Sequence, residues 1–397
     1  MSTDLTTGAS TARVAFYNDP KIRSIFYQVV LCVFIAFLVY GAASNAIENL
    51  RRAHIASGFG FWNTTAGFDI SQTLIPYNAD VSTYGRAFWV GLLNTLLVAG
   101  LGIFFATIIG FVIGISRLSK NWLVAKVASG YVETLRNIPL LLQLLFWYNA
   151  VLKALPIVRE SYRFPGGIYL NNRGLILPEP VLQPDFDWVT GAFIIGVVAS
   201  VSFHFWARRR QMRTGQRAPV FWVSAGLIVG LPAIVAALLG VPVLFDYPEA
   251  GRFNIIGGVG VQPEFLALLF GLSIYTGAFI AEVVRAGILA VSRGQTEAAY
   301  SLGLRPGPTL RLIVVPQAMR VIIPPLTNQY LNLTKNSSLA VAIGYPDLVQ
   351  VFTGTVLNQT GQAVEVVAIT MAVYLTISLA TSLAMNLYNR RMALVER

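Results

Sequence analysis

The chain has 397 residues, of which 55% are hydrophobic and only 12% carry a charged side chain, and its formal net charge is +11. Its length would suit a soluble protein of two or three domains. The apolar residues, however, lie in long runs that are nearly free of charge, and about 20 such residues span the hydrocarbon core of a bilayer. This distribution excludes an ordinary soluble protein and predicts an all-α, polytopic membrane protein.

Eight runs along the chain come near or exceed this length, and we expect each of them to form a transmembrane helix. They cover residues 25–45, 89–115, 130–152, 189–206, 218–242, 265–288, 318–334 and 364–387. An even number of spans places the two termini on the same side of the membrane.

The distribution of Lys and Arg predicts which side this is, because basic loops near span ends resist translocation. With the N-terminus inside, the inner segments carry a net +14 and the remaining residues −3, which together give the +11. The sequence therefore predicts that both termini are cytoplasmic. The basic charge reflects topology and contact with a lipid bilayer, and it does not predict nucleic-acid binding. Its densest cluster is Arg208, Arg209, Arg210, Arg213 and Arg217, which is typical of a stop-transfer and lipid-contact patch.

Several kinds of chemistry have no support in the sequence. Cys32 is the only cysteine, and the two histidines, His54 and His204, are far apart, so we expect neither a disulfide nor a metal site. The sequence has no Gly-x-x-x-x-Gly-Lys-Ser/Thr phosphate-binding loop. We therefore expect no catalytic residue and no cofactor bound by this chain, and any ATP with Mg²⁺ must bind a partner subunit.

Long segments between the spans have distinct compositions. Residues 46–88 are rich in aromatic side chains, which suggests an ordered extracytoplasmic element near the headgroups. Residues 153–188 contain many Pro, Gly and Asn residues and indicate a compact external loop. The Gly-rich segment 257–262 is expected to be a flexible turn. The two spans 189–206 and 218–242 form a hairpin around the arginine cluster.

The segment from Gly294 to Pro316 is polar and punctuated by glycine, although apolar spans lie on both sides of it. Glu297 is expected to open a short helix whose small alanines permit close docking, and Gly303 tolerates positive φ where that helix ends. A second short helix follows the break at residues 304–308. The residues that we assign to docking of a soluble partner are Gly294, Gln295, Glu297, Ala298, Ala299, Gly303, Ile313 and Pro316. An ordinary helix–turn–helix loop is the alternative.

This segment resembles the EAA loop in the membrane subunits of bacterial ABC importers. The sequence before it, with Ala281-Glu282, Arg285 and Ile288, is similar to the polar amino-acid (histidine/glutamine-type) permease subfamily. Three further segments match the same subfamily in the same order: 131–143 with its Glu-x-x-Arg-x-x-Pro pattern, Pro324-Pro325, and Lys335-Asn-Ser-Ser-Leu339. The resemblance covers about residues 88–152 and 263–390.

The resemblance implies a type I ABC-importer permease core that translocates L-amino acids across the bacterial inner membrane. It also implies an ABC ATPase dimer, a second permease subunit and a periplasmic amino-acid-binding protein as partners. Alternatives are the same machinery with another small polar cargo, such as an opine, a quaternary amine or a small peptide, and an ion-coupled secondary carrier. The core is expected in residues 88–152 and 263–397, with residues 1–87 as a leader, extra helix and periplasmic loop, and 153–262 as an insertion.

Charged and polar residues inside or beside the spans are the remaining candidates, because such groups need partners in a membrane. Glu133 and Arg136, and likewise Glu282 and Arg285, are three residues apart and are expected to pair locally, as structural neutralisation or as a gate. One helical face over residues 327–335 is expected to line the substrate path, with donors and acceptors from Tyr275, Asn328, Asn332 and Lys335. Hydrogen bonding between helices is the alternative role of these polar side chains.

Overall fold

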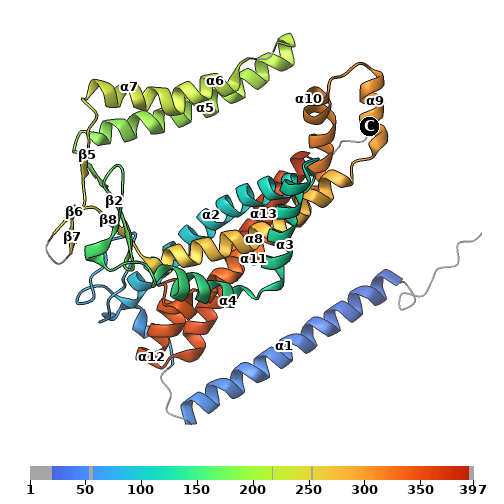
Figure 1. Cartoon of the computed structure of the whole chain (residues 1–397). Helices are drawn as coiled ribbons and strands as arrows, with labels where there is room; N and C mark the ends of the chain where they lie inside the picture. The colour runs from blue at the N-terminus through green and yellow to red at the C-terminus, as the bar shows by residue number, and fades with distance from the viewer. Residues whose placement is uncertain (1–19, 53–56, 217, 252–253, 393–397) are drawn as a thin grey trace, which may run out of the picture.

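The computed structural model describes residues 20–52, 57–216, 218–251 and 254–392. Figure 1 shows a bundle of helices with two separate helical elements beside it. The α-helices are α1 (Pro20–Arg52), α2 (Tyr84–Ser116), α3 (Trp122–Asn137), α4 (Leu140–Leu145), α5 (Phe186–Thr214), α6 (Val220–Ala225), α7 (Leu231–Leu238), α8 (Pro263–Leu289), α9 (Arg293–Ser301), α10 (Pro306–Thr309), α11 (Val315–Asn336), α12 (Leu357–Thr360) and α13 (Ala363–Met392). Short 3₁₀ or π segments are η2 (Gly60–Asn63), η3 (Phe146–Leu152), η4 (Val158–Glu160), η5 (Gly226–Gly230), η6 (Leu310–Val314), η7 (Ser337–Ile343) and η8 (Val349–Val356).

Seven helical segments within the described residues are long and apolar enough to cross a membrane, whereas the sequence predicted eight spans. They are Arg23–Ala42, Tyr84–Ser116, Phe186–Thr214, Val220–Leu238, Pro263–Leu289, Pro306–Ile343 and Ala363–Arg390. The difference is the predicted span 130–152, which the structure breaks between α3 and α4. Ile138 is extended, with ψ of 127°, because the residue before a proline is disfavoured in the α region. The apolar helix that follows Pro139, Leu140–Leu152, is too short to be a span by itself.

Glycines hold the centre of the bundle together, because they let the backbones of α2 and α8 approach closely. A Cβ atom added to Gly110 of α2 would lie 2.4 Å from Ile280 Cγ2, and one added to Gly114 would lie 2.7 Å from the Ala281 carbonyl oxygen. Helix α11 packs against both: a Cβ on Gly287 of α8 would lie 2.3 Å from Ile322 Cγ1, and one on Gly102 of α2 would lie 3.1 Å from Leu333 Cδ2. The three helices α2, α8 and α11 thus form one rigid unit.

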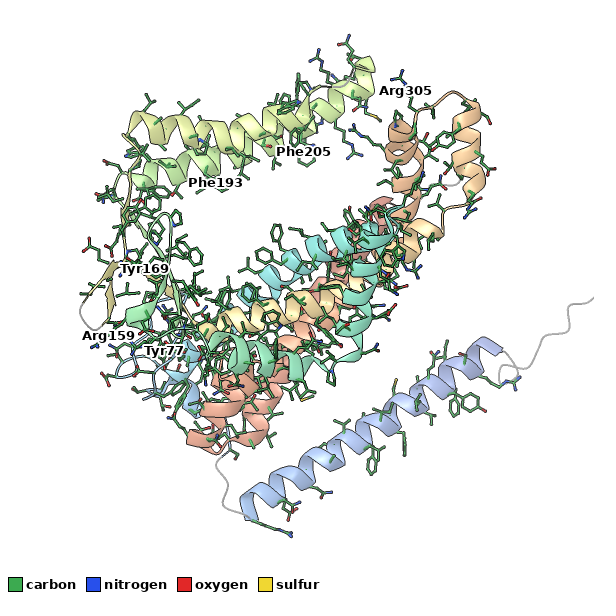
Figure 2. The ribbon with its side chains drawn as sticks, viewed as in Figure 1. Tyr77, Arg159, Tyr169, Phe193, Phe205 and Arg305 are labelled. Carbon is green, nitrogen blue, oxygen red and sulfur yellow. The ribbon has the colours of Figure 1, made fainter. Side chains whose placement is uncertain are left out.

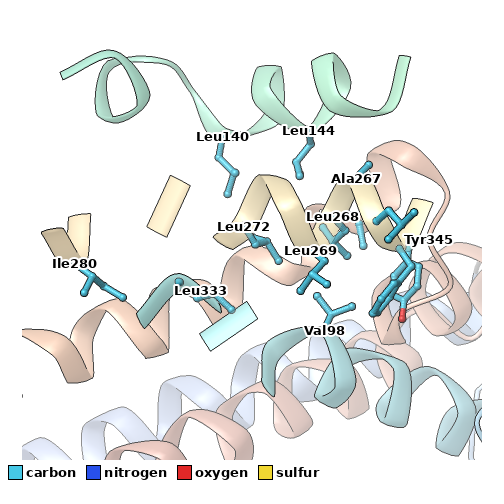
Figure 3. Close-up of a cluster of buried hydrophobic side chains, with 14 of the residues drawn as sticks. Val98, Leu140, Leu144, Ala267, Leu268, Leu269, Leu272, Ile280, Leu333 and Tyr345 are labelled. Carbon is cyan, nitrogen blue, oxygen red and sulfur yellow. The ribbon is translucent and has the colours of Figure 1, made fainter. Parts of the chain in front are cut away.

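Large buried side chains from several elements fill the interior near this unit. Figure 3 shows Val98 of α2, Leu144 of α4, Leu268 and Leu272 of α8 and Tyr345 gathered in one cluster. The broken segment therefore still belongs to the core, since α4 packs its leucines against α8. A second cluster joins the loop over residues 57–83 to α2 and η8, with the ring of Phe61 6.3 Å from that of Phe352. The predicted ordered element before α2 is thereby confirmed for residues 57–83.

Short strands form a cap at the end of the bundle where α8 begins, and this differs from a purely helical fold. The strands are β1 (Tyr162–Phe164), β2 (Ile168–Asn171), β3 (Gly174–Leu177), β4 (Glu179–Leu182), β5 (Val243–Asp246), β6 (Glu249–Ala250), β7 (Ile255–Ile256) and β8 (Val259–Val261). Antiparallel pairing in the order β1-β2-β3-β8 forms one sheet, and β4 pairs with β5, with Leu182 opposite Val243. The predicted flexible turn at 257–262 is wrong in part, because Val259–Val261 pairs with β3.

The inserted hairpin consists of α5 and the antiparallel run α6–η5–α7. Helix α5 buries Val189, Ala192, Gly196, Ser200 and Ala207, which lie on one face at helical spacing. A Cβ on Gly196 would lie 2.1 Å from the Leu227 carbonyl oxygen, so the two arms of the hairpin touch backbone to backbone. Figure 1 shows the hairpin and α1 standing apart from the α2–α8–α11 unit.

Candidate coupling loop and translocation face

The EAA-like segment forms a short helix, α9, that ends just before Gly303, as the sequence predicted. Two expectations are wrong in detail: α9 begins at Arg293, four residues before Glu297, and the second helix begins at Pro306 within the expected break and continues into α11. Helix α9 ends in a Schellman motif, in which the Leu304 N–H donates to the Ala299 carbonyl (3.1 Å) and the Gly303 N–H to the Tyr300 carbonyl (2.9 Å). Gly303 has φ of +77°, and no atom lies within 4 Å of an added Cβ. The glycine is therefore required by the backbone conformation and not by a close neighbour within this chain.

The two alanines of the motif occupy different environments. Glu297 and Ala298 are exposed, whereas Ala299 is buried within the chain, and this corrects the expectation that both alanines are free for docking. Ala299 instead supplies the carbonyl that closes the end of α9. Gly294 and Gln295 are exposed at the start of the helix.

Large apolar side chains on this loop are exposed, and sequence reasoning missed them. They are Tyr300, Leu302, Leu310 and Leu312, and Leu302 is 83% exposed. Exposed apolar groups gathered on one element mark an interaction site. The sequence does contain a signal for them: a leucine precedes Gly303, and leucines flank Arg311 on both sides, within an otherwise polar segment.

The loop is joined to the core by continuous helix on its C-terminal side. After α10 the chain passes through the π-helical turn η6 into α11. Pro316 has no backbone N–H, so a regular α-helical bond is missing here and a wider turn is accommodated. Ile313 and Pro316 are half-buried, and Gln317 donates to Gln295 Oε1 at 3.3 Å across the loop.

A largely apolar cavity of about 490 Å³ lies where the loop meets the bundle. Its lining comes from the end of α2, the start of α3, the end of α8 and the start of α11, and includes Ile115, Val124, Ile288, Leu310 and Ala318. Movement of the loop would therefore change the packing of all four helices at this end of the molecule.

Glu282 of α8 binds arginines from three helices. Its carboxylate pairs with Arg117 immediately after α2 and with Arg285 (2.5 Å), and Arg136 of α3 lies 4.0 Å away. The spacing along α8 predicts the Glu282–Arg285 pair, whereas Arg117 is distant in sequence and no local pattern predicts its contact with Glu282. The predicted Glu133–Arg136 pair is wrong: Glu133 is exposed, and Arg136 lies over the Phe279 ring at 5.0 Å and turns toward Glu282.

Helix α11 has a polar face that no other part of the described chain covers. Asn328, Asn332 and Lys335 are all exposed, while Leu326 and Leu333 on the opposite side are buried. Pro324 and Pro325 lie within the helix, one turn before this face. Amide and ammonium groups are costly in contact with lipid, so this face requires either water or another protein chain.

The structure does not bring Tyr275 to this polar face. Its ring packs on Phe279 with 4.9 Å between centroids, on the side of α8 where Arg136 lies. Among the described residues, it makes no hydrogen bond to Asn328, Asn332 or Lys335. Lys335 instead borders a cavity of about 500 Å³ between α11, η8 and α13. The polar side chains that line it with Lys335 are Ser338, which belongs to the Lys335-Asn-Ser-Ser-Leu339 motif, and Thr370, Tyr374 and Ser378, which the sequence pattern did not single out.

Comparisons with known proteins agree with this architecture. A family model described as the binding-protein-dependent transport system inner membrane component matches residues 99–394. The chain is 56% identical to the general L-amino acid transport system permease protein AapQ of Rhizobium johnstonii, over 97% of this chain and 96% of that protein. It is 50% identical to the putative amino-acid ABC transporter permease protein YhdX of Escherichia coli K12, over 96% of this chain and 97% of that protein.

A third relative is the glutamate/glutamine/aspartate/asparagine transport system permease protein BztB of Rhodobacter capsulatus, which is 45% identical over 96% of each chain. The solved structure of an amino acid ABC transporter with histidines matches 78% of this chain and 95% of that chain, with 23% identity and a TM-score of 0.46. The order of the motifs and the extra length predict similarity to the larger membrane subunit of a general L-amino-acid transporter, and the identity to AapQ confirms it. The chain belongs to the family of binding-protein-dependent transport system inner membrane components.

Proposed function

We propose that this chain is the permease subunit of an ATP-driven importer that moves L-amino acids across a bacterial inner membrane. Its relatives are named as amino-acid permeases, and two of them match nearly the whole chain at 50% identity or more. The proposed partners are an ABC ATPase dimer, a second permease subunit and a periplasmic amino-acid-binding protein. ATP and Mg²⁺ bind to the ATPase in this proposal.

The observation that carries the coupling mechanism is the exposed loop of α9 and α10. It presents Tyr300, Leu302 and Leu312 to a partner, and helix continues from it into α11, which is packed on α8. A rigid-body displacement of a docked ATPase would therefore move the polar face of α11. Of the residues proposed for coupling, Gly294, Gln295, Glu297 and Ala298 are exposed to the partner. The others, Ala299, Gly303, Ile313 and Pro316, shape the loop that carries them.

The orientation proposed for the chain has both termini in the cytoplasm. The seven long helices need an eighth crossing for this, and we assign it to α3 together with α4–η3: Val124 of α3 lies beside Leu310 at the coupling-loop end, and the Tyr148 hydroxyl of η3 donates to Glu264 at the start of α8. Helices α5 and α8 both begin beside the strand cap and run away from it, one to the arginine cluster and the other to the coupling loop (Figure 1). The basic ends then lie on the cytoplasmic side, as the positive-inside rule requires. The strand cap and residues 57–83 face the binding protein.

The test of this function is co-purification of subunits with the tagged chain carrying Gly303→Asp. Aspartate at φ of +77° is strained and adds charge to the dock, so we expect the ATPase to be lost while the second permease remains. Gly361→Asp is the matched control, because Gly361 also has positive φ (+69°) and open space around it, and it caps α12 away from the loop. If neither wild type nor the control carries an ATPase, an ion-coupled carrier is the better description.

The translocation path is proposed along Asn328, Asn332 and Lys335 of α11, and Tyr275, which packs on Phe279 on the side of α8 facing Arg136, is left out of it. The double variant Asn328→Ala/Asn332→Ala is expected to lower the uptake rate at least tenfold or to change amino-acid preference, because it removes two amide groups from the exposed face. Thr327→Val is the control, since the Thr327 hydroxyl is already bonded to the Ile323 carbonyl at 3.2 Å. Unchanged uptake rate and preference in the double variant would exclude this face as the path.

A further inference from the structure

The cytoplasmic end of α5 carries a groove of about 360 Å³ that is lined by Phe205, Arg208, Arg209, Met212 and Arg213. These residues follow the spacing i, i+3, i+4, i+7, i+8 and so share one face of the helix. The face lies opposite the buried residues Gly196, Ser200 and Ala207, by which α5 packs within the hairpin. The groove, called the arginine groove below, therefore points away from the other arm of the hairpin.

The arginine groove combines two kinds of surface. Phe205 and Met212 are apolar and exposed, and Met212 is 86% exposed. Arg208, Arg209 and Arg213 form no ion pair with any carboxylate in the part of the chain that the structure describes. Three uncompensated guanidinium groups beside an apolar wall are suited to a ligand with an anionic head and an apolar body.

The position of the groove along α5 selects the ligand. Helix α5 is a candidate span, and it ends at Gly215, which has φ of +71°. The groove thus occupies the last turns of a membrane-crossing helix, at the depth where the acyl chains of lipids meet their phosphate headgroups. Guanidinium groups bind phosphate in bidentate fashion, and basic clusters immediately beyond a span attract anionic lipids.

We propose that the arginine groove is a binding site for an anionic phospholipid, with the phosphodiester held by Arg208, Arg209 and Arg213 and an acyl chain against Phe205 and Met212. The site fastens the tip of the inserted hairpin to the leaflet on the side of the coupling loop. It gives the hairpin, which stands apart from the bundle, an attachment other than packing on the core (Figure 2 labels Phe205 on this arm).

Arg210 provides an internal comparison, because it belongs to the same run of arginines but not to the groove. Its guanidinium lies 5.4 Å from the centre of the Trp206 ring and donates to Gln216 Oε1 at 3.4 Å. Removing its charge changes the total charge of the cluster by the same amount as removing that of Arg209. A built site and a diffuse basic surface therefore predict different results for these two neighbours.

The test measures the dissociation constant of the tightest-bound phosphatidylglycerol on the purified, detergent-solubilised complex by native mass spectrometry. We expect Arg209→Gln to raise this constant about fivefold and the triple variant Arg208→Gln/Arg209→Gln/Arg213→Gln about 100-fold, from the contribution of each basic residue near a lipid surface. Arg210→Gln should change it less than twofold. Equal effects of Arg209→Gln and Arg210→Gln would overturn the proposal in favour of a non-specific charge effect.

Two further arms identify the source of the phosphate and guard against misfolding. Inorganic phosphate at the same concentration should not displace the lipid, and Phe205→Ala/Met212→Ala should weaken lipid binding with all charges kept. Displacement by inorganic phosphate would show a free-anion site and overturn the lipid assignment. The melting temperature should be the same in all variants, since every substituted side chain is exposed.

Discussion

Asp347 is a fully buried carboxyl group at the turn between η7 and η8. Its Oδ1 accepts the Gln350 N–H at 2.8 Å, which caps the start of the helix, and the Tyr374 hydroxyl donates to Oδ2 at 3.2 Å. The hydroxyl-bearing Tyr345 is also buried nearby, and no cation pairs with Asp347 in the described chain. Burial raises the pKa of Asp347 to about 7, although the backbone N–H groups oppose this shift.

This pKa predicts how stability depends on pH. The folded state holds the proton between about pH 4 and pH 7 while the unfolded chain has lost it, so the free energy of unfolding should fall as pH rises through this interval. Melting of the purified complex at pH 5 and pH 8 measures the effect. Asp347→Asn cannot titrate, and its melting temperature should decline less than that of wild type over this range. Equal declines would mean that Asp347 stays ionised when folded.

Glu282 is predicted to hold three helices together through one carboxylate. Glu282→Gln leaves Arg117 and Arg285 without a counter-charge, and because the site is partly buried we expect a loss of about 1–3 kcal/mol in the free energy of unfolding. Glu133→Gln is the control, since Glu133 is exposed and has no ion pair. Thermal or denaturant unfolding of both variants checks this, and a comparable loss in Glu133→Gln would contradict it.

At the level of elements, the close contact of α2 and α8 is the determining feature of the core. Glycines at Gly110 and Gly114 remove the side chains that would keep these helices apart. The apolar composition of both segments predicts that each spans a membrane, but composition does not predict that α2 packs against α8. Their pairing is set by complementary shape, with Ile280 and Val284 filling the space above the glycines.

Gly114→Val should separate α2 from α8 at the end near the coupling loop, because the new Cβ would lie 2.7 Å from the Ala281 carbonyl and 2.8 Å from Val284 Cβ. We expect a loss of at least about 2 kcal/mol of stability together with loss of ATP-coupled uptake. Gly100→Ala on the same helix meets nothing within 4 Å and should be neutral or slightly stabilising. Unfolding and uptake assays on the pair separate packing from helix propensity.

At the scale of the whole molecule, we propose that residues 153–262 are an insertion between two parts of the core. The insertion leaves and re-enters through one antiparallel ladder, since Leu182 lies opposite Val243 and the Gln183 N–H donates to the Pro242 carbonyl at 3.1 Å. The chain therefore leaves for the hairpin and returns from it at the same place. The hairpin can be present without displacing the core helices on either side.

Replacing residues 184–241 by Asn-Gly should therefore leave the core intact. The two residues suit a tight turn between β4 and β5, and removal of two spans preserves the orientation of every later helix. We expect the shortened chain to insert, to retain the ATPase and to lose the tightest phosphatidylglycerol site. Co-purification and native mass spectrometry give these readouts, and loss of the ATPase would show that the hairpin is part of the coupling machinery.

The sequence by itself determined the membrane class and the permease family, because hydrophobic run length and short motifs are local properties. It also indicated the segment that we propose for coupling, through the glycine at the end of α9. The tertiary structure decided what depends on contacts between distant segments. It paired Arg136 with Glu282 in place of Glu133 and buried Ala299, whereas the break at Pro139 is a local effect of the proline. The tertiary structure also separated Tyr275 from the polar face of α11. The loops before and after the hairpin pair with each other as strands, β3 with β8 and β4 with β5. Such outcomes follow from shape and charge across the packed bundle, which spacing along one helix does not record.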